Sequence, residues 1–188
     1  MSENGFIDPI AKFETPARLA ELAPTETLKR LGFGAQSVLC DIGAGTGIFT
    51  FAAAALSREP IYALDVSDDM LGIISRKAAQ VGADNVRCVK VTEAGFNLPP
   101  GVADMVLMCS MLHGMPDKPR FLSDAAALLK PEGRIAVIEF HYRETPMGPP
   151  VIRRLGPDEL TRIAAAANLS RADMFDLGDN FYCAVFTK

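Results

Sequence analysis

The sequence predicts an α/β fold: a doubly wound, mostly parallel sheet with helices on both faces. Short apolar runs typical of strands alternate with longer segments of helical periodicity along most of the chain. Three glycines at alternate positions, Gly43, Gly45 and Gly47, join the first apolar run to the helix that follows it. The 188 residues and the 49% hydrophobic content suffice for one core, so we expect residues 1–188 to form a single domain.

The N-terminal segment has the weakest pattern. Residues 1–16 contain Pro9 and Pro16 and indicate a loop with one helical turn. Apolar residues at helical spacing follow from Ala17 to Leu31, and Pro24 begins a second helix within this stretch. We expect residues 1–30 to cover a ligand site or to carry part of a substrate pocket, with an edge helix on the sheet as the alternative.

The first half of the sheet follows from three apolar runs. The second of these runs ends on Asp65, and Ser67 is placed to cap the helix after it. Gly82 stands where a helix prefers a C-terminal glycine. We expect strands at residues 37–41, 61–64 and 86–91 and helices at about 46–57 and 68–81.

The second half contains further strands, two helices and a closing hairpin. Asp104 interrupts the start of one apolar run, Pro131-Glu132-Gly133 forms a turn before the next, and Gly178-Asp179-Asn180 joins the last two. Residues 92–101 and 141–156 show no periodicity and are expected to be loops. We expect strands at residues 102–109, 134–140, 171–177 and 181–187 and helices at 116–130 and 157–167.

Composition excludes several classes of function. The net charge of −4, without any basic block, argues against a nucleic-acid surface. The four cysteines form no C-x-x-C pair and no metal-ligand cluster, so no metal is expected, and Cys40, Cys88 and Cys183 should be buried in apolar strands. No apolar run approaches the length of a membrane span, and the N-terminus lacks the features of a signal peptide. We expect a cytoplasmic monomer or homodimer.

The glycine turn predicts a nucleoside site. The third glycine of the dinucleotide pattern G-x-G-x-x-G would fall at Ile48, and Asp41, two residues before Gly43, would repel a pyrophosphate but suits a cationic ligand. Asp65 follows the second strand and can accept both hydroxyls of a ribose. The alternative for Asp65 is an acid that caps a helix.

The run from Asp41 to Gly47 resembles motif I of the class I S-adenosylmethionine-dependent methyltransferases, and the resemblance extends over about residues 35–188. It implies a Rossmann-like sheet of seven strands in the order 3-2-1-4-5-7-6, with a core at residues 35–188 that binds S-adenosyl-L-methionine and releases S-adenosyl-L-homocysteine. Residues 38–47 and 104–139 look most like the type 11 methyltransferase domain family that includes ubiquinone/menaquinone-biosynthesis and arsenite methyltransferases. The cysteine pattern gives arsenite little support.

The resemblance also implies roles for individual residues. Asp41 would order the loop and contact the amino-acid part of the ligand, Val66 and Met70 would pack on the adenine, and Cys109 would face the methionine end. Glu93-Ala94 resembles the acid–alanine pair that binds the adenine amine, although Thr92 could hold that position instead. The implied cofactor-binding residues are Asp41, Gly43, Ala44, Gly45, Gly47, Asp65, Val66, Met70, Thr92, Glu93, Ala94 and Cys109.

The run 104–117 resembles the family segment that often ends L-H-H-L-P-D, and His113 takes the place of its first histidine. His113 could act as the catalytic base that deprotonates a substrate nucleophile; the alternative is a histidine that orders the loop by hydrogen bonding. A base is not required in every case, because methyl transfer is an in-line displacement that depends mainly on alignment.

The substrate pocket is expected from residues 1–30, 111–115 and 141–156. Four methionines would make this pocket apolar and adaptable, namely Met108, Met111, Met115 and Met147. Arg153-Arg154 could bind an acidic group of the substrate, or could be an ordinary solvated pair.

The sequence therefore predicts an S-adenosylmethionine-dependent methyltransferase that acts on a small molecule, with the methylated atom undecided. One alternative is a non-catalytic S-adenosylmethionine-binding or regulatory protein on the same fold. A second alternative, an NAD(P)-dependent oxidoreductase, is disfavoured by Ile48 and Asp41.

Overall fold

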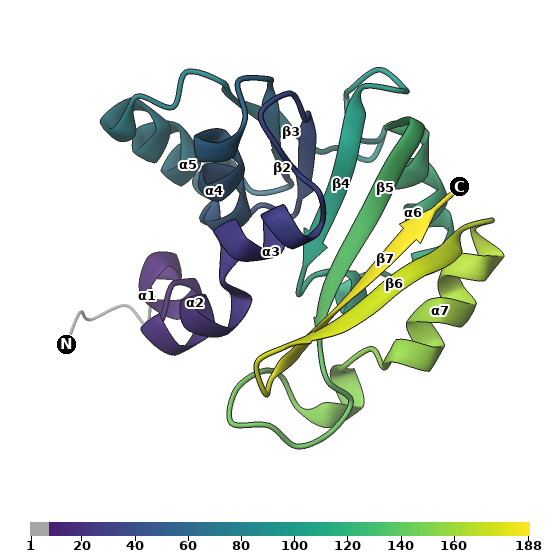
Figure 1. Ribbon diagram of the computed structural model, residues 1–188. Coiled ribbons are helices and arrows are strands. Elements are labelled where there is room, and N and C mark those ends of the chain that lie inside the picture. The colour runs from purple at the N-terminus through teal and green to yellow at the C-terminus, as the bar shows by residue number, and fades with distance from the viewer. Residues whose placement is uncertain (1–7) are drawn as a thin grey trace.

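Seven strands form one sheet in the order β3-β2-β1-β4-β5-β7-β6, as predicted. The computed structural model describes residues 8–188 (Figure 1). Strands β1 to β5 pair in parallel, and β7 is antiparallel to both of its neighbours, β5 and β6. The strands are β1 Leu39–Ile42, β2 Ile61–Asp65, β3 Val86–Lys90, β4 Ala103–Cys109, β5 Leu129–Phe140, β6 Ser170–Leu177 and β7 Phe181–Thr187.

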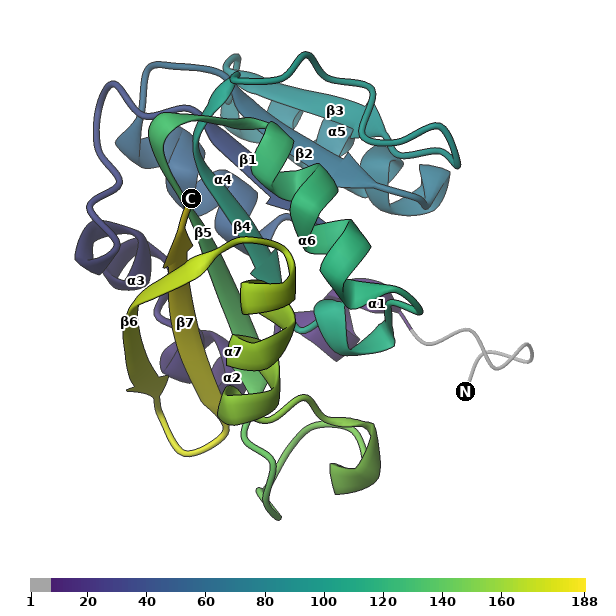
Figure 2. The ribbon, with the colours of Figure 1, turned by 90° about the vertical axis from the view of Figure 1, so that its right-hand side faces the viewer.

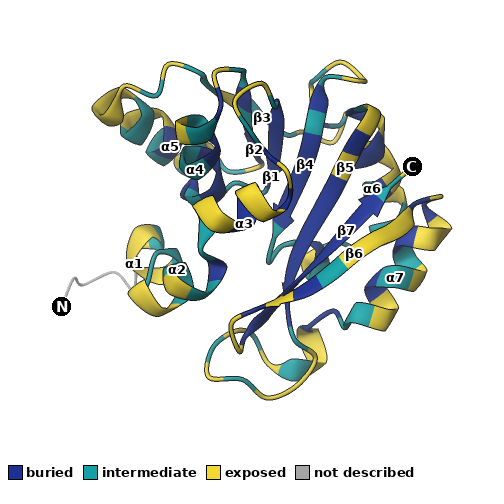
Figure 3. Ribbon diagram, in the orientation of Figure 1, coloured by how far each residue is buried: buried dark blue, intermediate teal, exposed yellow. Residues whose placement is uncertain are grey.

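Helices cover both faces of the sheet. The helices are α1 Pro9–Phe13, α2 Pro16–Leu22, α3 Pro24–Arg30, α4 Ile48–Leu56, α5 Asp68–Val81, α6 Lys118–Ala127 and α7 Pro157–Ala166, with 3-10 turns at Leu112–Gly114 and Val151–Arg153. Leu28 of α3 and Phe49 of α4 belong to the apolar cluster on one face. Leu122 of α6 and Leu160 of α7 belong to the cluster on the other, and both helices lie together in Figure 2. The central strands are consequently buried between two layers, whereas most of edge strand β6 is exposed, as Figure 3 shows.

The helix caps follow the sequence signals. The Ser67 hydroxyl accepts a hydrogen bond from the Met70 N–H at 3.4 Å, and α5 ends at Gly82 with φ of 66°. The Asp117 carboxylate accepts from the Arg120 N–H at 3.0 Å and begins α6. Pro24 occupies the first position of α3, as predicted.

Two boundary predictions are wrong. Helix α4 begins at Ile48 rather than near Thr46, because the glycine turn continues through Gly47. Helix α6 ends at Ala127, not near Lys130, and Pro131 to Gly133 lie within β5 instead of forming a separate turn. The pairing of β4 with β5 shifts register between Ala103 and Met105, which accommodates these residues as an irregularity.

The prediction that Cys88 is buried is also wrong. Cys88 lies on β3, which is an edge strand, and its side chain is exposed. Its thiol contacts the backbone carbonyl of Leu71 in α5, at 3.6 Å. Cys40 and Cys183, on central strands, are buried as expected. An apolar run alone does not distinguish an edge strand from a central one.

Helices α1 and α2 lie toward the end of the sheet to which β4 points, whereas α3 packs beside α4 (Figure 1). Ala23, with the left-handed φ of 36°, separates α2 from α3. Residues 1–7 lie outside the described part of the chain, and so does that part of the expectations for residues 1–16 and 1–30. Within residues 8–188, no helix is long and apolar enough to cross a bilayer.

Candidate functional site

The glycine turn is held against the end of β2. The N–H groups of Gly43 and Ala44 donate to the Leu64 carbonyl at 2.8 and 3.1 Å. A Cβ on Gly47, where φ is 90°, would stand 2.7 Å from the Phe51 ring, so a side chain there would be strained and would displace that ring. A Cβ on Gly45 would meet only the Gly43 carbonyl, at 3.9 Å, so this part of the turn faces open space. The sequence thus folds into a fixed turn with one open surface.

Asp65 lies directly beside this turn. One oxygen of its carboxylate accepts from the Gly45 N–H at 2.9 Å, and the other accepts from the Ser67 N–H at 2.9 Å. The side chain is 9% exposed. Because a carboxylate oxygen has two lone pairs, each oxygen retains one acceptor position after these bonds. Asp65 thereby ties the turn to β2 and remains able to accept two further donors.

Asp41 lies beneath the turn, on β1. Its carboxylate accepts from the Thr50 hydroxyl of α4 at 2.6 Å, and the residue is only 3% exposed. Burial raises the pKa of Asp41 to about 6; the Thr50 hydrogen bonds oppose this and the nearby Asp65 charge adds to it. Asp41 therefore links β1 to α4 below the loop, at the energetic cost of a buried negative charge.

Two side chains in this region lack a packing or hydrogen-bond partner among residues 8–188. Val66 follows Asp65 and is 70% exposed, which is unusual for a large aliphatic side chain after a buried strand. The hydroxyl of Thr46, within the glycine turn, is buried and has no hydrogen-bond partner among residues 8–188. An apolar surface, an open glycine and an unpaired hydroxyl around Asp65 fit a nucleoside with a polar extension. Met70, one helical turn from Val66, is partly exposed.

The segment after β3 also reaches this end of the sheet. The Val91 N–H donates to the Asp65 carbonyl at 3.0 Å, and Thr92 and Gly95 then close a short turn by two backbone bonds. The side chains of Thr92, Glu93 and Ala94 are exposed on this turn. The structure brings these three residues next to Asp65, while leaving both Thr92 and Glu93 as candidates for the same role.

The end of β4 carries Cys109 and the strained Ser110. Ser110 has a φ of 55° although it is not glycine, and its N–H donates to the Ile138 carbonyl at 2.7 Å. Arg18 of α2 donates to the Ser110 hydroxyl at 3.2 Å and approaches the Cys109 sulfur at 3.9 Å. Burial raises the pKa of the Cys109 thiol to about 11, so Cys109 stays neutral at physiological pH. Sequence patterns gave no signal for Arg18 or Ser110.

His113 pairs with an acid that the sequence analysis did not single out. Glu139 of β5 is 1% exposed, and its carboxylate accepts from the His113 backbone N–H at 3.1 Å and contacts the ring Nδ1 at 2.9 Å. The hydrogen bond to Glu139 raises the pKa of His113, partly offset by burial. With Nδ1–H directed at a carboxylate, the Nε2 atom of a neutral ring carries the free lone pair. An acid inside an otherwise apolar strand was the available signal for Glu139.

Two expected substrate contacts are wrong. Met108 is completely buried in the core on β4, so it cannot contact a ligand, whereas Met111 packs against Gly43 and is partly exposed. Arg154 is 6% exposed and donates to the carbonyls of Pro149, at 2.8 Å, and Arg143, at 2.7 Å, among others. With further bonds from Nη1 and Nη2, every nitrogen of the Arg154 guanidinium is engaged within the 141–156 segment, so this side chain holds the loop together. Among residues 8–188, no cluster of three or more potential ligands could hold a metal ion.

Comparisons with known proteins identify the family of this chain. The methyltransferase domain family matches residues 40–135, just over half of the chain. A ubiquinone/menaquinone biosynthesis C-methyltransferase of Marinomonas sp. is 30% identical over 122 residues, which cover 63% of this chain and 49% of that protein. The chain spans about half the length of the curated relatives it matches.

Solved structures extend the similarity to nearly the whole chain. A crystal structure of a SAM-dependent methyltransferase from Aquifex aeolicus is 25% identical, with a TM-score of 0.89 over 96% of this chain and 98% of that one. The Burkholderia thailandensis 1,6-didemethyltoxoflavin-N1-methyltransferase, solved with 1,6-didemethyltoxoflavin and S-adenosylhomocysteine bound, shares the fold. Its TM-score is 0.71 at 21% identity, over 90% of this chain and 78% of that one. The chain belongs to the methyltransferase domain family and, within it, to the class I S-adenosylmethionine-dependent methyltransferases.

Proposed function

We propose that this chain transfers a methyl group from S-adenosylmethionine to a small-molecule acceptor by in-line displacement. The observation that carries the proposal is the hydrogen bond from the Gly45 N–H to the Asp65 carboxylate, beside the exposed Val66. In this proposal residues 35–188 form the cofactor-binding core, and residues 1–30 cover the site as part of the same domain.

The nucleoside half of the ligand is assigned to the ends of β2 and β3. The two free acceptor positions on Asp65 match the two hydroxyls of a ribose. Val66 and Met70 offer apolar surface to the adenine, and removing Val66 from water would contribute roughly 1 to 2 kcal/mol to binding. Thr92, Glu93 and Ala94 lie where the adenine amine would reach.

The amino-acid half is assigned to the glycine turn and the end of β4. Gly43, Ala44, Gly45 and Gly47 shape the surface on which it packs. The buried Asp41 charge lies below and favours a cationic amino group. The unpaired Thr46 hydroxyl is available to a carboxylate, and the Cys109 backbone faces the methionine end. Lys77 joins the turn to the N-terminal segment, since its ammonium donates to the Thr46 carbonyl at 3.0 Å and to Glu14 at 2.7 Å.

The acceptor would be activated by His113. S-adenosylmethionine supplies an electrophilic methyl group on a sulfonium, whose neutral thioether is the leaving group. Glu139 holds His113 in one ring orientation through both the side chain and the backbone. The Nε2 atom can then take the proton of an approaching nucleophile, and Glu139 stabilises the imidazolium that results. A base of this kind is typical of hydroxyl, thiol or acidic carbon acceptors.

The experiment that tests the proposal is transfer of a radiolabelled methyl group. Purified protein is incubated with labelled S-adenosylmethionine and the small-molecule fraction of a cell extract, and labelled products are identified by chromatography and mass spectrometry. A labelled product whose formation is lost in Asp65→Ala is expected. Absence of any labelled product from protein that binds S-adenosylhomocysteine would instead support the non-catalytic cofactor-binding alternative.

A further inference from the structure

Arg18 is a partly buried cation that has no counter-ion in the described part of the chain. No carboxylate among residues 8–188 lies within 4.0 Å of its guanidinium. Its Nε atom is buried and has no hydrogen-bond partner in this part of the chain. Only Nη2 is engaged, by the Ser110 hydroxyl at 3.2 Å and the Cys109 sulfur at 3.9 Å. A guanidinium with an unpaired buried donor lacks the acceptors it needs.

Its surroundings strengthen this conclusion. Both partners of Nη2 are neutral, because Ser110 carries a hydroxyl and the raised pKa of Cys109 keeps that thiol protonated. The rings of Phe140 and Phe181 lie 5.6 and 5.1 Å from the guanidinium carbon and 4.4 Å from each other, so together they form one apolar surface beside the charge. The charge is therefore not neutralised locally, and an anion brought to it would be attracted more strongly than at an open surface.

Arg154 shows what a structural arginine looks like in the same protein. It is buried beside the same Phe140 ring, and its donors reach four backbone carbonyls and the Thr145 hydroxyl. These acceptors engage all three nitrogens of the guanidinium and hold a loop. Arg18 has no comparable set, although it is held at a similar distance from the ring. Within residues 8–188, the fold therefore leaves Arg18 donors without acceptors, whereas it provides acceptors for Arg154.

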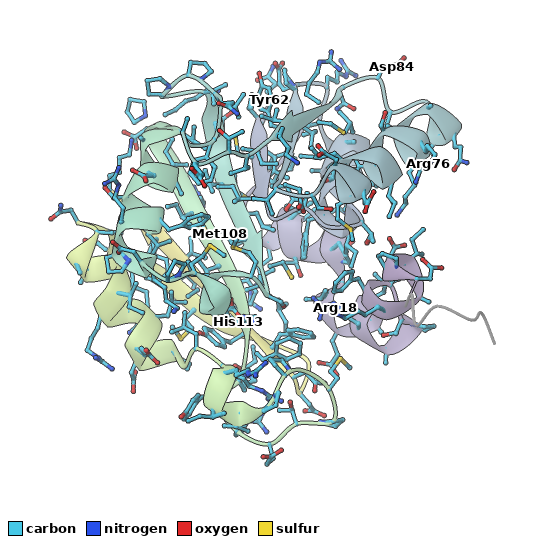
Figure 4. All side chains as sticks on the ribbon, turned by 180° about the vertical axis from the view of Figure 1, so that it is seen from behind. Arg18, Tyr62, Arg76, Asp84, Met108 and His113 are labelled. Carbon is cyan, nitrogen blue, oxygen red and sulfur yellow. The ribbon has the colours of Figure 1, made fainter. Side chains whose placement is uncertain are left out.

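The position of Arg18 relates it to the methyl acceptor. Ser110, to which it binds, immediately follows β4, and its N–H is bonded to Ile138 of β5, one residue before Glu139. His113 pairs with Glu139 at this same end of the sheet. Figure 4 shows Arg18, from the N-terminal helices, and His113, from the turn after β4, both at that end. An anionic group held by Arg18 would thus place the rest of a small molecule at the end of β4 and β5.

We propose that Arg18 binds a carboxylate of the methyl acceptor, which is a small organic acid with an apolar or aromatic body. This inference rests on the proposed methyl transfer. A planar carboxylate can accept from two guanidinium N–H groups in parallel, and it would give the unpaired donors their partner. The phenylalanine rings match an apolar body beside the acid group. The single guanidinium suits a monoanion.

The test uses the Nε–H signal of Arg18 in nitrogen-15 NMR spectra of the full chain. The signal is assigned by its loss in Arg18→Lys. Sodium benzoate and its neutral counterpart benzamide are titrated into protein alone and into protein saturated with S-adenosylhomocysteine. We expect a saturable shift with benzoate and none with benzamide. Arg18→Met should weaken benzoate binding at least about tenfold. Arg30→Met is the matched control, because Arg30 also lies over a phenylalanine ring but on α3.

Three results would overturn the inference in distinguishable ways. If benzamide shifts the Nε–H signal as much as benzoate does, or if no saturable shift is seen, Arg18 does not form an anion site. The second result is that Arg18→Met weakens the binding of S-adenosylhomocysteine more than tenfold and leaves the binding of 5′-methylthioadenosine, which has no carboxylate, unchanged. Arg18 would then bind the carboxylate of the cofactor and not that of the acceptor. If wild-type protein binds benzoate through Arg18 but no S-adenosylhomocysteine, the proposed function fails while the anion site stands. The wild-type titration reads the site even if a variant does not fold.

Discussion

Asp41→Asn should stabilise the protein at neutral pH and weaken its hold on the cofactor. Asp41 is a buried acid whose pKa is raised to about 6 from an ordinary value of 3.8, mainly by burial. The asparagine has nearly the same shape, carries no charge and can still accept the Thr50 hydrogen bond through its amide oxygen. It therefore imitates the protonated form of Asp41 at every pH.

The size of the stabilisation follows from linkage. Because the folded-state pKa of this acid is higher than its unfolded-state value, the folded state binds more protons between pH 3.8 and 6, and stability falls as pH rises through this window. At about 1.36 kcal/mol for each pKa unit, the difference between 3.8 and about 6 corresponds to roughly 3 kcal/mol at pH 7. Below the unfolded-state value the carboxyl is protonated in both states and the penalty disappears.

Urea unfolding of wild type and Asp41→Asn between about pH 3.5 and 7 measures this difference. The free energy of unfolding of the variant minus that of wild type should grow by about 3 kcal/mol from the acidic to the neutral end, while contributions from other groups largely cancel. A difference that does not change with pH would refute the reasoning, because it would mean that ionising Asp41 costs nothing in the folded state.

The same substitution should act in the opposite direction on ligand binding. If Asp41 favours the cationic amino group of S-adenosylmethionine, Asp41→Asn should weaken cofactor binding at pH 7 by about tenfold. In wild type, binding near pH 6 should release protons, which calorimetry in buffers of different ionisation enthalpy detects. Unchanged affinity in the variant would restrict Asp41 to ordering the loop.

Three further predictions concern the other parts of the site. Glu139→Gln weakens the hydrogen bond and removes the charge that together raise the pKa of His113, so the acidic limb of the kcat profile should move to lower pH. The value of kcat should fall about tenfold or more with little change in KM, and an unmoved profile would exclude His113 as the base. Gly47→Ala should lower the free energy of unfolding by about 2–5 kcal/mol, because its φ is positive and the new Cβ would meet the Phe51 ring. Gly34→Ala is the control and should change this free energy little, because its Cβ would meet no atom within 4 Å. Val66→Ser should weaken S-adenosylhomocysteine binding several-fold without destabilising the fold, because Val66 is 70% exposed, and equal affinity would argue against an adenine contact.

The fold could be predicted from the sequence because its signals are local and consistent. The periodicity of each segment, the Ser67 cap, the Gly82 terminus and the Gly178–Asn180 turn each fixed one element. The strand order came from the resemblance of the glycine turn to a known family rather than from periodicity. The errors arose where pairing between distant segments decides the bounds of an element. Residues around Pro131, for example, belong to β5 because β5 pairs with β4 from Leu129 onward.

The residues proposed to bind the cofactor could be selected from the sequence for a similar reason, whereas Arg18 and Glu139 could not. Asp41 and Asp65 lie within a motif of fixed spacing, next to the turn they hold. Arg18 reaches Ser110 across 92 residues, and Glu139 reaches His113 across 26, so no spacing rule links either pair. The adjacent arginines at 153 and 154 were a more visible pattern, yet Arg154 holds a loop.

The central claim is that Asp65 and the glycine turn hold S-adenosylmethionine. Calorimetric titration of the wild-type chain with S-adenosylmethionine, with NADH as the comparison ligand, tests it most directly. The account predicts one site of micromolar affinity for S-adenosylmethionine, no binding of NADH, and loss of the S-adenosylmethionine signal in Asp65→Ala that still unfolds cooperatively in urea. Tight NADH binding, or S-adenosylmethionine affinity that survives in Asp65→Ala, would contradict it.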